Sequence, residues 1–145
     1  MKLVIALCGM LLSTWVSAAS CRDVAAAVNA RLQPHVDTLE LVEILTALNA
    51  THRLPNNFVT KREAKNSGWQ RGRDLWDVPG LHGKSIGGDK FSNFEQQLPP
   101  GQWREADLDY KGGHRGAKRL VFSVQGRRFV TVNHYQTYME IPACL

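Results

Sequence analysis

The sequence is short of cysteines and of long apolar runs, and each shortage excludes a class of protein. The three cysteines among 145 residues stand far apart, which excludes a C-x-x-C redox centre and a cysteine zinc site. The longest apolar run, Leu3 to Trp15, is shorter than the roughly 20 residues that cross a bilayer. A phosphate-binding loop is also absent, because Val78 stands where a loop ending in Gly83-Lys84 needs a glycine. The remaining composition, 43% hydrophobic and 21% charged, is typical of one globular domain.

The first 19 residues have the pattern of an export signal. Lys2 supplies a charged start, an apolar run follows, and Ser17-Ala18-Ala19 offers a small-residue cleavage site. We predict cleavage after Ala19, which leaves residues 20–145 as one secreted domain, extracellular or periplasmic and not bound to a membrane. Loss of Lys2 lowers the formal net charge from +5 to +4. A basic domain suggests an anionic partner, although many exported proteins are basic without one.

Two cysteines remain once the signal and its Cys8 are removed. Cys21 and Cys144 lie at opposite ends of the remaining chain, and an even count in an oxidising compartment predicts one disulfide between them. The alternative is lipid attachment at Cys21. It is disfavoured because no large aliphatic residue stands three positions before the cysteine.

Helical patterns occupy the first half of the domain. Apolar residues recur at helical spacing from Asp23 to Leu32, and Pro34 ends that segment. A second helix is predicted after Asp37, with Glu40 three residues on as the partner of a capping box. Its apolar stripe is expected in the core and consists of Leu41, Ile44, Leu45 and Leu48.

A third, short helix is predicted to begin after Thr60, which forms a capping box with Glu63, and to close at Gly68. Lys61 falls in its first turn, where the positive helix end disfavours a cation. That lysine is therefore either simply solvated or held there for another task. The segment from Gly72 to Asp89 has the composition of turns, with a single helical turn at Asp74 to Val78.

Strand-like alternation begins at Trp103 and continues to Tyr110. Segments Leu120 to Val124 and Phe129 to Val132 form a hairpin through Gln125-Gly126, and Tyr135 to Ile141 is a further strand. Helices followed by strands predict an α+β domain, with the N-terminal helices packed on one face of a twisted antiparallel β-sheet.

Charged residues of complementary kinds gather on this predicted sheet. Glu105 and Asp107 share one strand face, Arg115 and Arg119 lie four residues apart, and His134 precedes the last strand. A carboxylate, an imidazole and fixed cations suit general acid–base catalysis on a phosphodiester. The five histidines show no metal-ligand spacing, so no metal is predicted. The alternative is that these residues form a surface ion network.

Four sequence blocks, in this order, resemble the barnase-type family of secreted bacterial ribonucleases, also called microbial guanyl-specific ribonucleases. The blocks span residues 54–64, 83–93, 103–107 and 134–137. The resemblance covers roughly residues 36–141 and leaves residues 20–35 as an additional N-terminal helix. It implies a metal-independent, cofactor-free endoribonuclease that cleaves single-stranded RNA 3′ to guanine. Cleavage would pass through a 2′,3′-cyclic phosphate that is then hydrolysed.

The resemblance also implies a role for each matching residue. Glu105 matches the general base and His134 the general acid, and these roles exchange in the hydrolysis step. Three cations match those around the scissile phosphate, where the transition state is more negative than the substrate, namely Lys61, Arg115 and Arg119. Asp89 and Asp107 match carboxylates that support these cations.

Base recognition is implied for the segment after the second family block. The residues matched to substrate binding are Phe91, Ser92, Asn93, Glu95 and Tyr135. Phe94 replaces a basic residue of the family, so one cationic contact to RNA or to an inhibitor is lost and stacking can take its place. His114 is expected to be exposed, with an extra phosphate contact as the alternative.

The implied partners are single-stranded RNA and a barstar-like acidic protein inhibitor, and the domain is expected to be a monomer. Two other functions stay open. One is a basic RNA-binding module that has lost catalysis, and the other is the same nuclease used as an antibacterial toxin.

Overall fold

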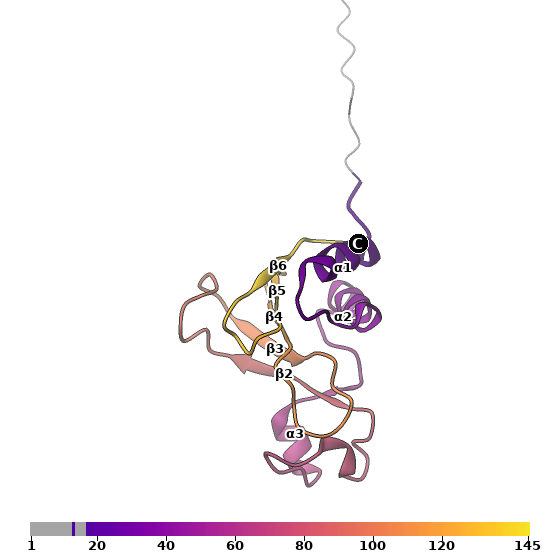
Figure 1. Ribbon diagram of the computed structural model, residues 1–145, viewed down its shortest axis with the longest axis vertical. Helices are drawn as coiled ribbons and strands as arrows, with labels where there is room; N and C mark the ends of the chain where they lie inside the picture. Colours follow the sequence, from indigo (N-terminus) through magenta and orange to yellow (C-terminus); the bar gives the residue numbers. More distant parts are fainter. Residues whose placement is uncertain (1–12, 14–16) are drawn as a thin grey trace, which may run out of the picture.

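The computed structural model describes residue 13 and residues 17–145. Most of the predicted signal, including Cys8, lies outside the described residues. The described chain forms three α-helices, one short 3₁₀ helix and a six-stranded sheet in the order β1-β2-β3-β4-β5-β6 (Figure 1). None of its helices is both long and apolar enough to cross a membrane.

The elements follow the predicted order of helices before strands. The helices are α1 (Cys21–Arg31), α2 (Thr38–Thr51), α3 (Lys61–Asn66) and the 3₁₀ helix η1 (Leu75–Asp77). The strands are β1 (Phe58–Val59), β2 (Ser85–Phe91), β3 (Trp103–Asp107), β4 (Arg119–Ser123), β5 (Arg128–Thr131) and β6 (Met139–Ile141). The α+β class is therefore confirmed, although β1 pairs with β2 in parallel and makes the sheet mixed.

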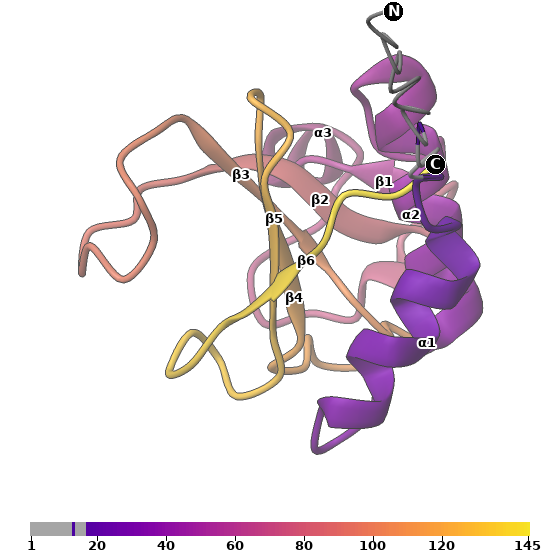
Figure 2. The ribbon, with the colours of Figure 1, turned by 90° about the horizontal axis from the view of Figure 1, so that it is seen from above.

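Helices α1 and α2 lie side by side against one face of the sheet, as Figures 1 and 2 show. The predicted apolar stripe of α2 is fully buried there and packs with Ala106 of β3 and Leu120 of β4. Each such leucine or isoleucine contributes about 1.5–3 kcal/mol by leaving water. This layer is the main hydrophobic core. Helix α3 instead packs in a smaller cluster, around Trp69 and Tyr110.

The cap of α2 differs from the predicted capping box. The Asp37 carboxylate does accept from the backbone amides of Leu39 and Glu40. The Glu40 side chain, however, accepts from the backbone amide of Asp109 at 3.0 Å rather than from the cap residue. Asp109 in turn accepts from the amide of Asp37. The second half of the box is thus replaced by a contact across the fold, whereas the predicted box of Thr60 and Glu63 on α3 is complete.

The turn-like composition of Gly72 to Asp89 predicts no strand there, and this prediction is wrong for residues 85–89, which belong to β2. Its two glycines lower strand propensity, but packing requires at least one of them. A Cβ on Gly87 would lie 2.6 Å from a ring carbon of Phe58 and 2.9 Å from a methyl of Leu54. Gly87 therefore lets the first strand and the preceding turn approach β2 closely.

Two predicted strands are shorter than expected. β3 ends at Asp107, because Asp109 adopts a left-handed backbone with φ 58°. β6 begins only at Met139, and Tyr135 belongs to the loop before it. The alternation of polar and apolar residues continues past the points where the backbone leaves the sheet.

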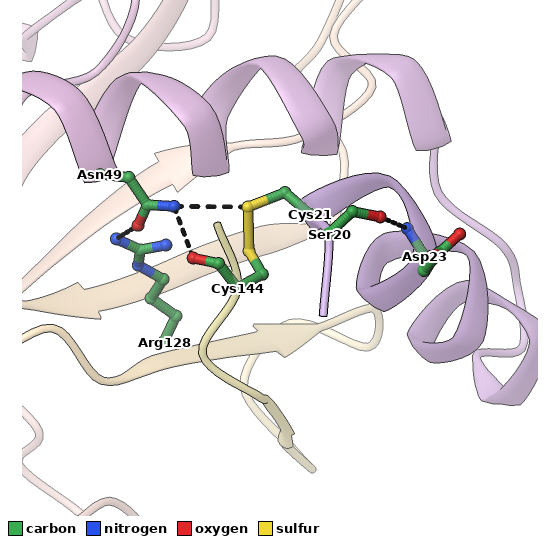
Figure 3. The surroundings of a disulfide bond; sticks show 6 residues. All are labelled: Ser20, Cys21, Asp23, Asn49, Arg128 and Cys144. Carbon is green, nitrogen blue, oxygen red and sulfur yellow. Dashed lines mark hydrogen bonds between the residues drawn. A yellow bond between two sulfur atoms is a disulfide. The ribbon is translucent and has the colours of Figure 1, made fainter. Parts of the chain in front are cut away.

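The predicted disulfide between Cys21 and Cys144 is present, and it joins the start of α1 to the end of the chain. Figure 3 shows Asn49 of α2 beside it. The Asn49 amide donates to the carbonyl of Cys144 at 2.8 Å and to the sulfur of Cys21 at 3.3 Å. Its oxygen accepts from Arg128 of β5 at 2.8 Å. One side chain therefore links α2 to both cysteines and to the sheet.

Candidate active site

Glu105 lies on β3, on the face of the sheet that α1 and α2 do not cover. Its side chain is only 12% exposed. One carboxylate oxygen accepts a 2.5 Å hydrogen bond from the Tyr135 hydroxyl, and the other lies 3.7 Å from the Lys61 ammonium. Burial raises the pKa of Tyr135 and the bond to Glu105 raises it further, so the phenol stays protonated and remains a donor. These contacts fix the orientation of the Glu105 carboxylate, which is the candidate general base.

Asp107, two residues along the same strand, is buried and pairs with two arginines. Arg115 donates to both of its oxygens, each at 2.7 Å. This bonding raises the pKa of Arg115, so its guanidinium stays charged. Arg119 places its Nε 2.9 Å from one Asp107 oxygen, but the N–H is not aligned for a hydrogen bond, so the contact is an ion pair only. Asp107 therefore holds both predicted phosphate-binding arginines.

Asp89 supports Lys61 through the backbone rather than through the ammonium group. Its carboxylate accepts from the Lys61 amide at 3.0 Å, at the first turn of α3. A carboxylate at this helix end is favourable, and it anchors the turn from which the lysine extends. The Lys61 side chain is 40% exposed, which leaves its charge available to a ligand.

His134 and Tyr135 occupy the loop between β5 and β6, and both have left-handed backbone conformations, with φ 54° and 69°. The amide of His134 donates to the carbonyl of Ala117, and that of Tyr135 donates to the hydroxyl of Thr131, each at 3.1 Å. The rings of His134 and Tyr135 are 4.9 Å apart. Because Tyr135 also binds Glu105, it connects the candidate acid to the candidate base.

A cavity of about 500 Å³ extends from His134 across the two arginines. No carboxylate is among the described residues that line it. Its other basic residues are His114, which is exposed as expected, and Arg71 and Arg73, which the sequence reasoning did not assign. The Arg-Gly-Arg pattern in a turn segment was the available signal for them. Six basic side chains thus surround one hollow, which is suited to phosphate groups.

The predicted base-recognition loop follows β2. The ring of Phe91 stacks on Tyr135, with centroids 5.3 Å apart and an interplanar angle of 22°. A cavity of about 170 Å³ lies beside this pair. It is lined by Phe91, Ser92, Asn93, Phe94, Glu95, Gln97, Tyr135 and Tyr138. All five predicted substrate-binding residues therefore line one cavity, together with Tyr138, which the sequence reasoning missed because it was placed within a strand.

Asn93 organises this loop from inside. Its side chain accepts from the Leu98 amide at 3.1 Å and donates to the Leu98 carbonyl at 2.8 Å. Its φ of 49° turns the chain. The Glu95 carboxylate is exposed and accepts a 3.0 Å hydrogen bond from Gln97. Asn93 thus shapes the loop, while Glu95 keeps a carboxylate oxygen for a ligand.

Among the described residues, no group of three or more histidine, cysteine, aspartate or glutamate side chains could hold a metal ion. The metal-free mechanism remains a prediction from the family resemblance. The structure brings together the predicted residues as two adjoining parts. One is the catalytic part around Glu105 and His134, and the other is the base-recognition loop.

Comparison with known proteins points to one family. A family model described as ribonuclease matches residues 45–142. A ribonuclease of Heyndrickxia coagulans is 45% identical over 93 residues, which cover 61% of this chain and 84% of that protein. The ribonucleases of Bacillus intermedius and Bacillus pumilus are also 45% identical over 93 residues, but the match spans only 56% of their length.

The matched segment contains every predicted catalytic and base-binding residue. Helix α1, the first half of α2 and both disulfide cysteines lie outside it. The chain belongs to the family of barnase-type bacterial ribonucleases.

Proposed function

We propose that this chain is a secreted endoribonuclease that cleaves single-stranded RNA 3′ to guanine without a metal ion. One observation carries the proposal. The Glu105 carboxylate accepts a hydrogen bond from Tyr135, and the His134 ring lies 4.9 Å from the ring of the same tyrosine. The two groups flank two arginines that a single buried aspartate fixes. A base, an acid and fixed positive charge are what phosphodiester cleavage by acid–base catalysis requires.

The first step forms a cyclic phosphate. Glu105 removes the proton of the ribose 2′-hydroxyl, and the oxygen attacks the neighbouring phosphorus. The bond between phosphorus and the 5′-oxygen of the next nucleotide breaks, and His134 in its protonated form donates a proton to that oxygen. The 2′-hydroxyl is the nucleophile, so DNA is not cleaved by this route.

The second step hydrolyses the cyclic phosphate. Neutral His134 takes a proton from water as the water oxygen attacks phosphorus, and protonated Glu105 gives its proton to the departing 2′-oxygen. The product ends in a 3′-phosphate, and both side chains return to their initial states.

The cations lower the energy of the transition state. The pentacoordinate phosphorane carries more negative charge than the diester, so fixed positive groups favour it over the substrate. Arg115 and Arg119 are held by Asp107 before substrate arrives, and little reorganisation is needed during the reaction. Lys61, beside Glu105, supplies a third charge.

Guanine is assigned to the cavity beside Phe91. A base there can stack on the aromatic rings, and Glu95 can accept hydrogen bonds from the N1–H and amino group of guanine. An unpaired base is needed for this contact, so flexible single-stranded RNA is the expected substrate.

The test is cleavage of a short RNA that contains one guanine, with EDTA present. The wild-type protein should produce a guanosine 2′,3′-cyclic phosphate end. Glu105→Ala and His134→Ala should each lower the rate by about 100-fold or more, while circular dichroism shows that both variants stay folded. A wild-type protein that binds the RNA but leaves it intact would instead be an RNA-binding module.

The same cationic cleft is suited to an acidic protein inhibitor of the barstar kind. Complementary charge accelerates such association. Because position 94 is phenylalanine rather than a cation, we expect weaker inhibition than a basic residue would give. Titration of the cleavage assay with barstar tests this partner, and an absence of inhibition at any concentration would reject it.

A further inference from the structure

We propose that Phe94 forms a second nucleobase site, which stacks the base of the nucleotide preceding the guanine. This inference rests on the proposed function, because it requires guanine to occupy the neighbouring cavity. The starting observation is that the Phe94 side chain is 89% exposed, although it stands at the rim of a cavity lined by other aromatic rings. A single exposed apolar residue is ordinary, but an exposed aromatic ring at the edge of a cavity that is proposed to hold one base is a surface on which a neighbouring base can stack.

The loop holds Phe94 outward. Asn93 has a left-handed backbone, and its side chain is bonded to both the amide and the carbonyl of Leu98. The amide of Gln96 donates to the Asn93 carbonyl at 2.9 Å, which closes a turn around position 94. Figure 2 shows that the connection between β2 and β3 extends away from α1 and α2. A ring presented by a braced loop loses little conformational freedom when it binds.

The cavity beside Phe91 already contains aromatic rings on which one base can stack. Phe91 and Tyr135 are stacked on one another and form one of its walls. Its volume of about 170 Å³ is below the roughly 300–1,000 Å³ of pockets for larger ligands, so it can accept one base and no more. The outer face of Phe94 is then left for a second base outside the cavity.

The direction of the RNA strand determines which of its bases lies at Phe94. The leaving nucleotide lies at His134, which lines the cationic cavity with Arg71 and Arg73. No residue of the loop 91–97 lines that cavity. The RNA on the other side of guanine, which is the 5′ side, therefore runs past Phe94.

The experiment compares two substrates, ApGpC and the same trinucleotide with an abasic residue in place of the first adenosine. In the wild-type protein the abasic substrate should have a KM about tenfold higher, as expected for the loss of one base stacked on an aromatic side chain. In Phe94→Ala the KM ratio of the two substrates should fall to about one, and in Phe94→Trp the ratio should be kept. Val124→Ala, at an exposed apolar residue of the β4–β5 hairpin, should leave the ratio and the rate as in wild type.

Two results would overturn the assignment. One is a wild-type protein that cleaves both trinucleotides with equal KM. The other is a Phe94→Ala protein that keeps the tenfold ratio, because Phe94 would then act on guanine itself or on nothing. Cleavage of GpC by the wild type is measured alongside. If GpC and both trinucleotides stay intact, the proposed nuclease function fails, and that result is distinct from the failure of the Phe94 site.

Discussion

The two faces of the sheet are built from different kinds of contact. The face toward α1 and α2 is packed with buried apolar side chains and ends at a disulfide. The opposite face has a smaller apolar cluster, made of Leu98, Trp103, Val121 and Phe129. That face also carries Glu105, the ion pairs of Asp107, and a cavity surrounded by basic side chains. Apolar packing supplies most folding free energy, whereas clustered like charges oppose it. The comparison teaches that the candidate site is confined to one face of the sheet, whereas the larger apolar core lies on the other face.

We expect a substitution at Asp107 to have the largest effect, because it should lower both the stability of the fold and the rate of RNA cleavage. Asp107→Asn removes the buried charge that holds Arg115 and Arg119, and it leaves two guanidinium groups without their carboxylate. We expect a loss of about 3–5 kcal/mol in the free energy of unfolding, together with a fall in RNA cleavage of about 100-fold. Urea unfolding and the guanine-cleavage assay measure the two effects.

The matched control is Glu140→Gln, which breaks the exposed ion pair with Arg127. It should change neither quantity appreciably, because solvent screens such pairs. If Asp107→Asn were as mild as this control, the cation-holding role of Asp107 would be rejected.

A substitution in the helix-covered core should affect stability alone. Leu45→Ala removes a fully buried side chain of α2 and should cost about 2–5 kcal/mol. The rate of cleavage, measured well below the melting temperature, should stay within about twofold of wild type, because the apolar cluster that contains Leu45 includes no residue of the candidate site. Leu39→Ala, at a 71% exposed position of the same helix, is the control for stability. A large loss of rate in folded Leu45→Ala would show that the two faces are coupled.

Removal of the disulfide at the chain ends should also lower stability without changing the cleavage rate. The double variant Cys21→Ser, Cys144→Ser should lose about 2–4 kcal/mol of stability. Its cleavage rate should be unchanged while it is folded, since both cysteines lie on the helix side. Thermal unfolding of wild type with and without a reductant should reproduce the difference. Equal melting temperatures in all three samples would mean that Asn49 and its hydrogen bonds suffice to hold the ends.

The smallest effect is expected at Glu40, a titratable group on the helix side. Burial raises its pKa above the ordinary 4.5, so the folded state binds this proton more tightly than the unfolded chain. Stability from Glu40 is therefore present below pH 4.5 and is lost as the pH rises through the raised pKa. Glu40→Gln keeps an acceptor for the Asp109 amide and should remove this decline. Urea unfolding at acidic and neutral pH compares the slopes, and parallel slopes would contradict the prediction.

Local patterns predicted most of the helices and the hairpin of β4 and β5, because these elements depend on neighbouring residues. These patterns failed where contacts between residues far apart in the sequence determine the structure. Gly87 lowers the strand propensity of β2, yet Phe58 and Leu54 leave no room for a side chain. The partner of Glu40 proved to be Asp109, 69 residues away, rather than its neighbour in the helix cap.

Sequence patterns likewise predicted some residues of the candidate site and missed others. Glu105, Asp107 and the arginines were found from spacing and resemblance, because they stand on regular strands or beside them. Arg71 and Arg73 were not found, since a turn segment has no periodicity that indicates where its side chains point. The tertiary fold alone brings that segment next to the loop of Arg115.

The left-handed backbone conformations of His134 and Tyr135 determine how a substitution at position 134 affects stability. Two successive residues with side chains hold a conformation that costs about 1–2 kcal/mol each and that glycine adopts freely. Replacing His134 by glycine should therefore make the fold more stable while it removes the proposed acid. A search for heat-resistant variants that ignores activity would favour the loss of this histidine. If His134 is the proposed acid, its backbone conformation trades stability for catalysis, and selection for RNA cleavage would have to maintain that trade.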